Sequence, residues 1–198
     1  GQHPTVPHLP PHTHYIPLDD APDGITRVLD VAQLEDVVYA VPGDPMVGDD
    51  TVTRLLALAH DAGLTVKVVS GISVVEPALR LLGVNALDGL QVLDGASVAA
   101  MHHPPINPDT AALLAHVRAE NVPALKRVLL NQYPDTFEVT LLHDVGSDDA
   151  RVEPLSLSAL DSATLADALL FVPALGGMAS FQRFEEIIAH LRAPEGCP

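Results

Sequence analysis

Two glycine-containing loops carry the residues of this sequence that are best placed to hold a ligand. The first loop, residues 42–45 (Pro-Gly-Asp-Pro), directly follows an apolar, β-branched run at 37–41. The second, residues 70–73 (Ser-Gly-Ile-Ser), follows a similar run at 65–69. Ligands of open α/β sheets bind outside the carboxyl ends of the strands, and glycine allows close approach to the backbone. The two loops therefore indicate a binding edge for a small molecule.

Ordinary turn chemistry is the alternative explanation of both loops. Proline, glycine and aspartate are each favoured in tight turns. Ser73 also stands three residues before Glu76, the spacing of a helix-capping box. The residues alone leave both explanations open.

Other kinds of catalytic site find little support. Four histidines (His3, His8, His12 and His14) lie on a proline-rich N-terminal arm that we expect to be extended and solvated, so we expect no metal site. The single cysteine, Cys197, excludes an intrachain disulfide and a multi-cysteine zinc site. The sequence has neither a G-x-S-x-G elbow nor a phosphate-binding P-loop.

Composition and charge narrow the partners. The 198 residues include 10 Lys and Arg against 26 Asp and Glu, which gives a formal net charge of −16. This charge excludes sequence-independent binding to nucleic acid or an anionic membrane, since both depend on basic side chains. No apolar run reaches the roughly 18 residues of a membrane span, and we find no signal-peptide layout. We therefore expect a cytoplasmic protein with a neutral or cationic small ligand.

The order of elements predicts an α/β fold. Buried strands are expected at 37–41, 65–69 and 89–93, with helices from Asp49 or Asp50 to Gly63 and from Ser73 to Leu82 between them. Alternation of strands and helices implies crossover connections and a parallel sheet. The proline-rich segment 101–108 is expected to link this part to a second lobe.

The second lobe is predicted to have a mixed sheet. Strands are expected at 111–117, 137–143, 152–157 and 168–172, and helices at about 122–132 and 178–191. Residues 146–149 are typical of a hairpin loop, so antiparallel pairing is expected. The expected domains are thus 1–107, 108–177, and a terminal helix with a junction at 178–198.

Several motifs, in this order, resemble a known family. Residues 38–47 (VYAVPGDPMV) and 68–73 (VVSGIS) resemble two motifs of the tetrapyrrole methylases, the class III S-adenosylmethionine-dependent methyltransferases. Residues 90–94, 133–135 and 171–175 are similar to the methylase-like domain that precedes MazG-type nucleoside triphosphate pyrophosphohydrolases, and 191–198 resemble the junction to that enzyme. The resemblance covers nearly the whole chain. It implies a two-lobed fold whose N-terminal parallel sheet lacks its first strand and Gly-rich loop.

The resemblance also implies a site for S-adenosylmethionine in the cleft between lobes. The residues that would line it are Pro42, Gly43, Asp44 and Val47 on one side, Ser73 and Val74 opposite, and His116 and Gly146 from the second lobe. No metal ion and no catalytic residue are assigned. Since the sulfonium already activates the methyl group, the protein's task would be to align donor and acceptor and to exclude water.

Three hypotheses follow for function. The first is a methyltransferase-like domain of a homodimeric, bifunctional protein with a MazG-type pyrophosphohydrolase, acting on a methyl acceptor that the sequence does not name. The second is a catalytically degenerate methylase fold that serves as a binding, dimerisation or regulatory module. The third is an unrelated nucleotide-binding α/β protein, which would prefer a nucleoside triphosphate over S-adenosylhomocysteine.

Overall fold

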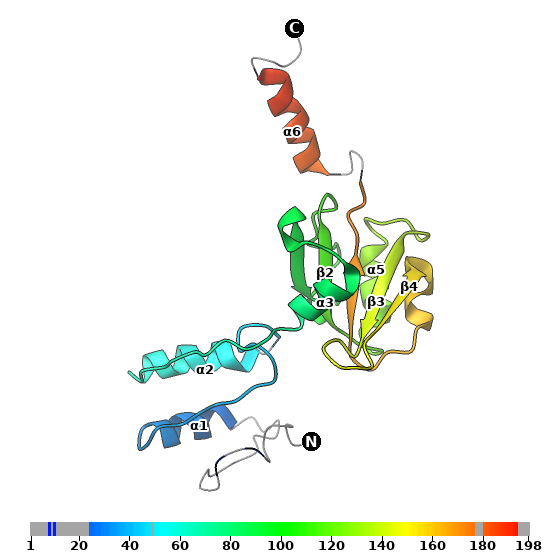
Figure 1. Cartoon of the computed structure of the whole chain (residues 1–198). Helices are drawn as coiled ribbons and strands as arrows, with labels where there is room; N and C mark the ends of the chain where they lie inside the picture. Colours follow the sequence, from blue (N-terminus) through cyan, green and yellow to red (C-terminus); the bar gives the residue numbers. More distant parts are fainter. Residues whose placement is uncertain (1–7, 9, 11–23, 49, 177–179, 194–198) are drawn as a thin grey trace. The chain divides into compact units, whose positions relative to one another are not determined.

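Alternating apolar runs and proline- or glycine-containing turns fold the chain into two units (Figure 1). The computed structural model describes residues 8, 10, 24–48, 50–176 and 180–193. The first unit comprises Gly1–Val74 and the second Val75–Pro198. The two units are described separately below.

The second unit is built on a five-stranded mixed sheet with the strand order β1-β2-β5-β3-β4. The strands are β1 (Leu90–Asp94), β2 (Ala111–Val117), β3 (Glu138–His143), β4 (Arg151–Ser156) and β5 (Ala168–Val172). β1 and β2 are parallel, whereas the other three pairs are antiparallel. The directions of these pairs make β1, β2 and β3 run the same way, so their carboxyl ends lie at one edge of the sheet.

One face of this sheet forms the hydrophobic core. Two helices, α4 (Gly95–Ala99) and α5 (Val122–Leu129), and the 3-10 helix η3 (Leu157–Ser162) contribute to it. α5 follows the pattern expected of an amphipathic helix, and its buried side chains, Leu125 and Leu129 among them, meet Leu114, Leu141 and Leu170 of the strands in one cluster. This cluster supports the strand ends that carry the polar groups described below.

The remaining helices of the second unit lie outside the sheet. They are α3 (Val75–Leu82), the 3-10 helix η2 (Ala86–Asp88) and the C-terminal α6 (Phe181–Arg192). The hydroxyl of Ser180 accepts a hydrogen bond from the Arg183 backbone N–H, which caps α6. Ser180 also donates to the Asp109 carboxylate, so the start of α6 is tied to the loop before β2.

The first unit contains the helices α1 (Gly24–Ala32) and α2 (Asp50–Asp61). The two helices contact each other, and α2 buries Val52, Leu55 and Ala59, the face that its periodicity predicts. The hydroxyl of Tyr39 forms a hydrogen bond of 2.9 Å with Thr51, which joins the segment before the first loop to α2.

The strands predicted at 37–41 and 65–69 are not formed within the described residues. Both segments lack strand pairing, and Val38 and Val69 are 91% and 69% exposed. A β-branched run becomes a strand only when a neighbouring strand accepts its backbone hydrogen bonds and covers its side chains. The described part of the first unit offers no such neighbour, so the predicted parallel N-terminal sheet is corrected here, while the α/β class of the fold is confirmed.

The second unit confirms most of the remaining elements. Strands are found at all five predicted places from residue 89 onward, and the predicted hairpin loop joins antiparallel β3 and β4. The segment 101–108 does not divide the chain as expected, because β1 and β2 on its two sides pair in one sheet. α3 starts at Val75, not Ser73, α5 ends at Leu129, and α6 starts at Phe181.

Three parts of the prediction lie outside the described residues. These are most of the N-terminal arm with His3, His12 and His14, the residue Asp49, and residues 194–198 of the junction with Cys197. In the described part of the chain, no helix is both long and apolar enough to cross a membrane.

Candidate functional site

The two predicted loops of the first unit are joined by one carboxylate. Oδ2 of Asp44 accepts a hydrogen bond of 3.0 Å from the backbone N–H of Gly71, and Oδ1 accepts one of 2.9 Å from the N–H of Met46. The N–H of Val47 donates to the Asp44 carbonyl at 3.1 Å, which closes the first loop as a tight turn. Asp44 therefore fixes its own loop and holds the second loop against it.

Glycine is required at the contact between these loops. A Cβ at Gly71 would lie 2.1 Å from the carbonyl oxygen of Gly43, a distance that no side chain tolerates. Gly43 has a φ of +78°, in the left-handed region that favours glycine, and a Cβ there would lie 3.5 Å from the Ile72 carbonyl oxygen. Turn chemistry alone would not need the close approach at Gly71, so the structure gives these glycines a second role, which is contact between the loops.

The other predicted residues of the first unit border this contact. Pro42 and Gly43 are exposed, whereas Asp44, Val47 and Val74 are partly buried. Ser73 is the one buried polar residue among them, at 6% exposure, and it takes part in a polar interaction. The structure thus brings Gly43, Asp44 and the second loop together, and it leaves the exposed backbone of both loops accessible.

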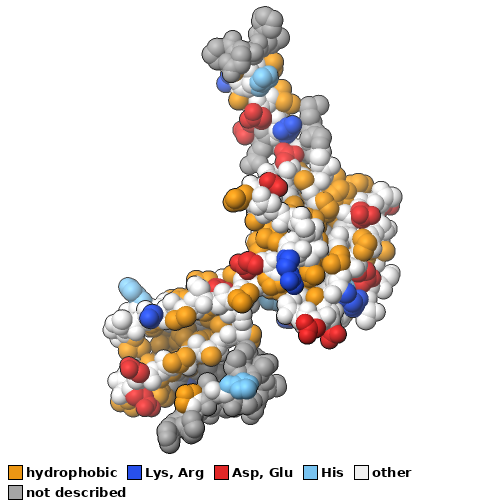
Figure 2. Space-filling model, in the orientation of Figure 1, with side chains coloured by type: hydrophobic (Ala, Val, Ile, Leu, Met, Phe, Trp, Pro, Cys, Tyr) orange, Lys and Arg blue, Asp and Glu red, His pale blue; other side chains and the backbone are white. Residues whose placement is uncertain are grey.

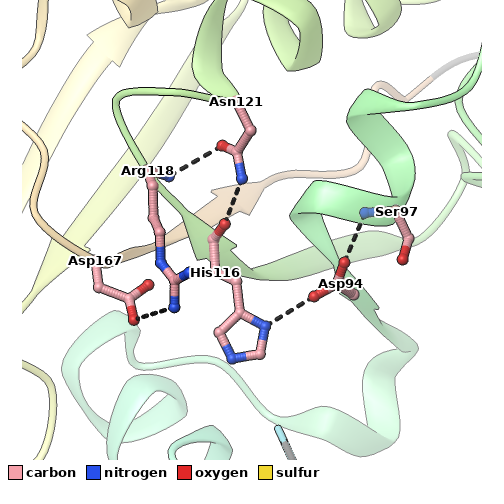
Figure 3. A network of polar contacts seen from close by, with 6 residues as sticks. All are labelled: Asp94, Ser97, His116, Arg118, Asn121 and Asp167. Atoms are coloured by element: carbon pink, nitrogen blue, oxygen red, sulfur yellow. Dashed lines mark hydrogen bonds and ion pairs between the residues drawn. The ribbon is translucent and has the colours of Figure 1, made fainter. Parts of the chain in front are cut away.

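A second polar site lies in the second unit, at the carboxyl ends of β1 and β2 (Figure 3). Nδ1 of His116 and Oδ2 of Asp94 are 2.7 Å apart. The other carboxylate oxygen, Oδ1, accepts a hydrogen bond of 2.6 Å from the Ser97 N–H, so Asp94 also caps α4. Both side chains are partly exposed, at 32% for His116 and 40% for Asp94.

The backbone at His116 is unusual. Its φ is +55°, in the left-handed region, and the pairing of β2 with β5 shifts register between Leu114 and Val117. Asn121 supports this bulge from both sides: its Nδ2 donates to the His116 carbonyl at 2.7 Å, and its Oδ1 accepts from the Arg118 N–H at 3.0 Å (Figure 3). Bulges of this kind re-aim side chains and are common next to functional sites.

The electrostatics of this network favour an ionised Asp94. Partial burial by itself would raise the pKa of the Asp94 carboxyl, but the hydrogen bonds from His116 and from Ser97 outweigh it, so the pKa lies below its ordinary value. Arg118 forms an ion pair of 3.1 Å with Asp167, and this hydrogen bond raises the pKa of the guanidinium. Asp94 is therefore a permanent hydrogen-bond acceptor near neutral pH.

Gly146 lies in the exposed turn between β3 and β4, with a φ of +93°. It follows β3 at the same edge of the sheet as His116, but β5 separates β2 from β3. At about 4.8 Å between neighbouring strands, the axes of β2 and β3 are about 10 Å apart. The structure therefore shows the same edge for these two residues, without a contact between them.

Sequence reasoning missed Asp94, Gly95 and Asn121. The sequence offered one signal, an aspartate directly after an apolar strand, which is the same signal that singled out Asp44. A Cβ at Gly95 would lie 2.7 Å from the Ala115 carbonyl oxygen, so this glycine lets α4 approach β2 beside the network. Among the described residues, no group of three or more His, Cys, Asp and Glu side chains could hold a metal ion.

The comparisons with known proteins agree with this fold. The chain matches the family Tetrapyrrole (Corrin/Porphyrin) Methylases over residues 4–161. It is 29% identical over 182 residues to the uncharacterized protein YabN of Bacillus subtilis (strain 168), covering 86% of this chain and 36% of YabN. The chain thus spans about a third of the length of this relative.

Solved structures give the same class. Uroporphyrin-III C-methyltransferase from Thermus thermophilus is 25% identical, with a TM-score of 0.55 over 69% of this chain and 63% of that one. A second structure of the enzyme, complexed with S-adenosylhomocysteine, matches at 15% identity with a TM-score of 0.54 over 75% of this chain and 71% of that one. The methyltransferase CobJ matches at 16% identity with a TM-score of 0.64, over 86% of this chain and 80% of that one.

The fold is therefore that of the class III methyltransferases, which use S-adenosylmethionine. The chain belongs to the tetrapyrrole methylase family and is a methyltransferase-like domain of that family.

Proposed function

We propose that the chain binds S-adenosylmethionine through the two loops that Asp44 joins, and that it supports transfer of the methyl group to an acceptor. The observation that carries the proposal is the bond between the Asp44 carboxylate and the Gly71 N–H, which fixes two glycine-containing loops side by side. The residues proposed to contact the cofactor in the first unit are Pro42, Gly43, Asp44, Val47, Ser73 and Val74. His116 and Gly146 of the second unit are proposed contacts on the resemblance to the family.

The cofactor's own chemistry explains why these loops contain no catalytic acid or base. Its sulfonium makes the methyl group ready for transfer, so binding, orientation and exclusion of water are the protein's main contributions. Exposed backbone groups at Gly43 and Gly71 offer donors and acceptors at close range. The carboxylate of Asp44 adds a negative charge next to a cationic ligand.

Calorimetric titration of S-adenosylhomocysteine into the 198-residue chain tests the proposal. The unmodified chain is expected to bind, and Asp44→Ala is expected to lose at least tenfold in affinity because the loops separate. Asp36→Ala, an exposed aspartate of the same unit, serves as the matched control and should bind normally. Absence of binding heat at millimolar ligand would overturn the proposal.

A non-catalytic module is the second candidate function, and one observation favours it. Apolar side chains are exposed on the first unit, including Val38 at 91% and Ile72 at 79% (Figure 2). Surfaces of this kind commonly mark interaction sites. Sedimentation analysis of the chain, with and without Val38→Asp, tests this function: a dimer that the substitution dissociates, together with no binding of S-adenosylhomocysteine, would favour the module.

The fusion to a MazG-type pyrophosphohydrolase is a further part of the proposal, supported by the resemblance of residues 191–198 to such a junction. The parent protein is then expected to release pyrophosphate from nucleoside triphosphates. An assay of the full-length protein for pyrophosphate release tests this part, and no release from any common nucleoside triphosphate would contradict it.

A further inference from the structure

The geometry points to a proton-accepting pair in the second unit: His116 accepts a proton through Nε2 from a protic nucleophile, such as a hydroxyl or an N–H group of a ligand, and Asp94 is its positioning residue. The methyl-transfer setting of this inference rests on the proposed function. The pair itself rests on the contacts that Figure 3 shows.

The hydrogen bond to Asp94 decides which ring nitrogen carries the proton. An ionised carboxylate can only accept, so Nδ1 of His116 must donate across the 2.7 Å contact. In the neutral imidazole the lone pair then lies on Nε2. No hydrogen bond of Nε2 is found among the described residues, and the side chain is about one-third exposed, so a ligand can reach this nitrogen.

The surroundings hold the ring in place, as a proton acceptor requires. Asp94 cannot turn freely, since its second oxygen is bonded to the Ser97 N–H at the start of α4. The His116 backbone is fixed by the bond from Asn121 and keeps its positive φ. A strained, well-supported residue in a bulge is a frequent feature of functional sites.

The nearby charges suit an imidazole that gains a proton. Asp94 offers a negative charge in direct contact with the ring, which stabilises the imidazolium. The other charged groups of the network are Arg118, which is paired with Asp167 of the segment before β5, and Glu120 in the turn after β2. α4 and Asn121 contribute no titratable group.

The proposed step balances. The bond between sulfur and the methyl carbon breaks, and its electron pair stays on sulfur as a neutral thioether. The nucleophile of the acceptor forms the new bond to carbon, and its proton passes to Nε2 of His116. The products are the methylated acceptor, S-adenosylhomocysteine and an imidazolium paired with Asp94. No other reactant is needed.

Asp94→Asn is the decisive substitution because the fold dictates how the amide must turn. Its oxygen is expected to keep the bond to the Ser97 N–H, which leaves the NH₂ group facing Nδ1 of His116. That donor would force the proton onto Nε2 and remove the lone pair from the exposed nitrogen. Asp167→Asn is the matched control, since it removes a neighbouring carboxylate without touching the ring.

Two measurements on the full chain test the inference without any methyl acceptor. Nitrogen-15 NMR of the His116 ring at mildly alkaline pH should show the proton on Nδ1 in the unmodified chain and in Asp167→Asn, and on Nε2 in Asp94→Asn. Carbethoxylation of His116 by diethylpyrocarbonate, followed by mass spectrometry, should be at least tenfold slower in Asp94→Asn. His60, which is exposed on α2, provides an internal reference whose rate should not change.

The outcomes separate this inference from the proposed function. A proton on Nε2 in the unmodified chain, or equal carbethoxylation of His116 in the chain and in Asp94→Asn, would overturn the proton-accepting pair. Failure to bind S-adenosylhomocysteine would overturn the methyltransferase proposal instead, and it would leave the NMR result on the ring unaffected.

Discussion

The carboxylate of Asp44 accepts a hydrogen bond of 3.0 Å from the backbone N–H of Gly71, 27 residues further along the chain. At the same place the Gly43 carbonyl would lie 2.1 Å from any Cβ at position 71. The contact is therefore between two backbones, with one side chain as the bridge. It gives both glycine-containing loops a defined position without a strand ladder between the segments that carry them.

Gly71→Ala tests whether this contact holds the loops together. The added methyl group clashes with backbone, which cannot move as a side-chain tip would, so the loops must separate and the bond to Asp44 must lengthen or break. We expect a loss of S-adenosylhomocysteine affinity of at least tenfold and a lower free energy of unfolding of the first unit. Calorimetric titration and chemical denaturation measure the two effects.

Gly63→Ala is the control for this substitution. Gly63 has a φ of +70°, but a Cβ there would meet nothing within 4 Å, so only the backbone strain of about 1 kcal/mol is added. Its ligand affinity should equal that of the unmodified chain. Equal affinities for Gly71→Ala and Gly63→Ala would show that the contact between the loops does not matter for binding.

Substitutions of Asn121 separate the two bonds that support the bulge at His116. Asn121→Ala removes both bonds and is expected to lower the free energy of unfolding by about 1–3 kcal/mol. Asn121→Asp keeps an acceptor for the Arg118 N–H but loses the donor to the His116 carbonyl. If that second bond is the important one, Asp should be at least as destabilising as Ala, as urea denaturation would show; an Asp variant as stable as the unmodified chain would refute this.

The lowered pKa of Asp94 predicts the acid sensitivity of the second unit. A carboxyl whose pKa is lower in the folded state stabilises the fold above its unfolded pKa, about 3.9, and this stabilisation is lost as the pH falls through the folded pKa. Asp94→Asn should therefore lose stability near neutral pH and show a weaker dependence on pH below about 4. Denaturation at a series of pH values measures the difference, with Asp148→Asn of the exposed hairpin loop as the control. Parallel pH curves for the chain and Asp94→Asn would contradict it.

The strands of the second unit could be predicted because their signal is local. β5 was predicted with its observed bounds, 168–172, since a short apolar run is bounded by polar residues before it and by proline after it. β2 and β3 were also found within about a residue of their bounds, and each buries its apolar side chains in the sheet that the pattern requires.

The first unit shows where local signals end. The runs at 37–41 and 65–69 have the composition of buried strands, yet their fate depends on partners that no local pattern contains. The same applies to the polar network: Asp94 and His116 are 22 residues apart, and only the parallel pairing of β1 with β2 brings them together. The loop glycines were found, in contrast, because turn chemistry is written in adjacent residues.

Tyr133 offers a test of the core that is independent of any ligand. Its side chain is 2% exposed and packs against Phe137, with ring centroids 5.0 Å apart, but its hydroxyl has no hydrogen-bond partner among the described residues. Burial raises the pKa of this phenol to about 12. Tyr133→Phe removes an unsatisfied polar group and keeps the ring, so the free energy of unfolding should stay equal or rise by about 1 kcal/mol at neutral pH.

Alkaline pH should widen this difference. Because the folded pKa lies above the unfolded one of about 10, the tyrosine's contribution is complete below pH 10 and is lost as the pH rises toward 12. Tyr133→Phe lacks that loss, so its advantage over the unmodified chain should grow through this window. Tyr39→Phe is the contrasting variant: its hydroxyl is bonded to Thr51, so its removal should cost about 1 kcal/mol. Destabilisation by Tyr133→Phe at neutral pH would mean that the phenol has a partner after all, and a water molecule held between Tyr133 and the equally unsatisfied Oε1 of Gln132 is the arrangement that the burial of both atoms would then favour.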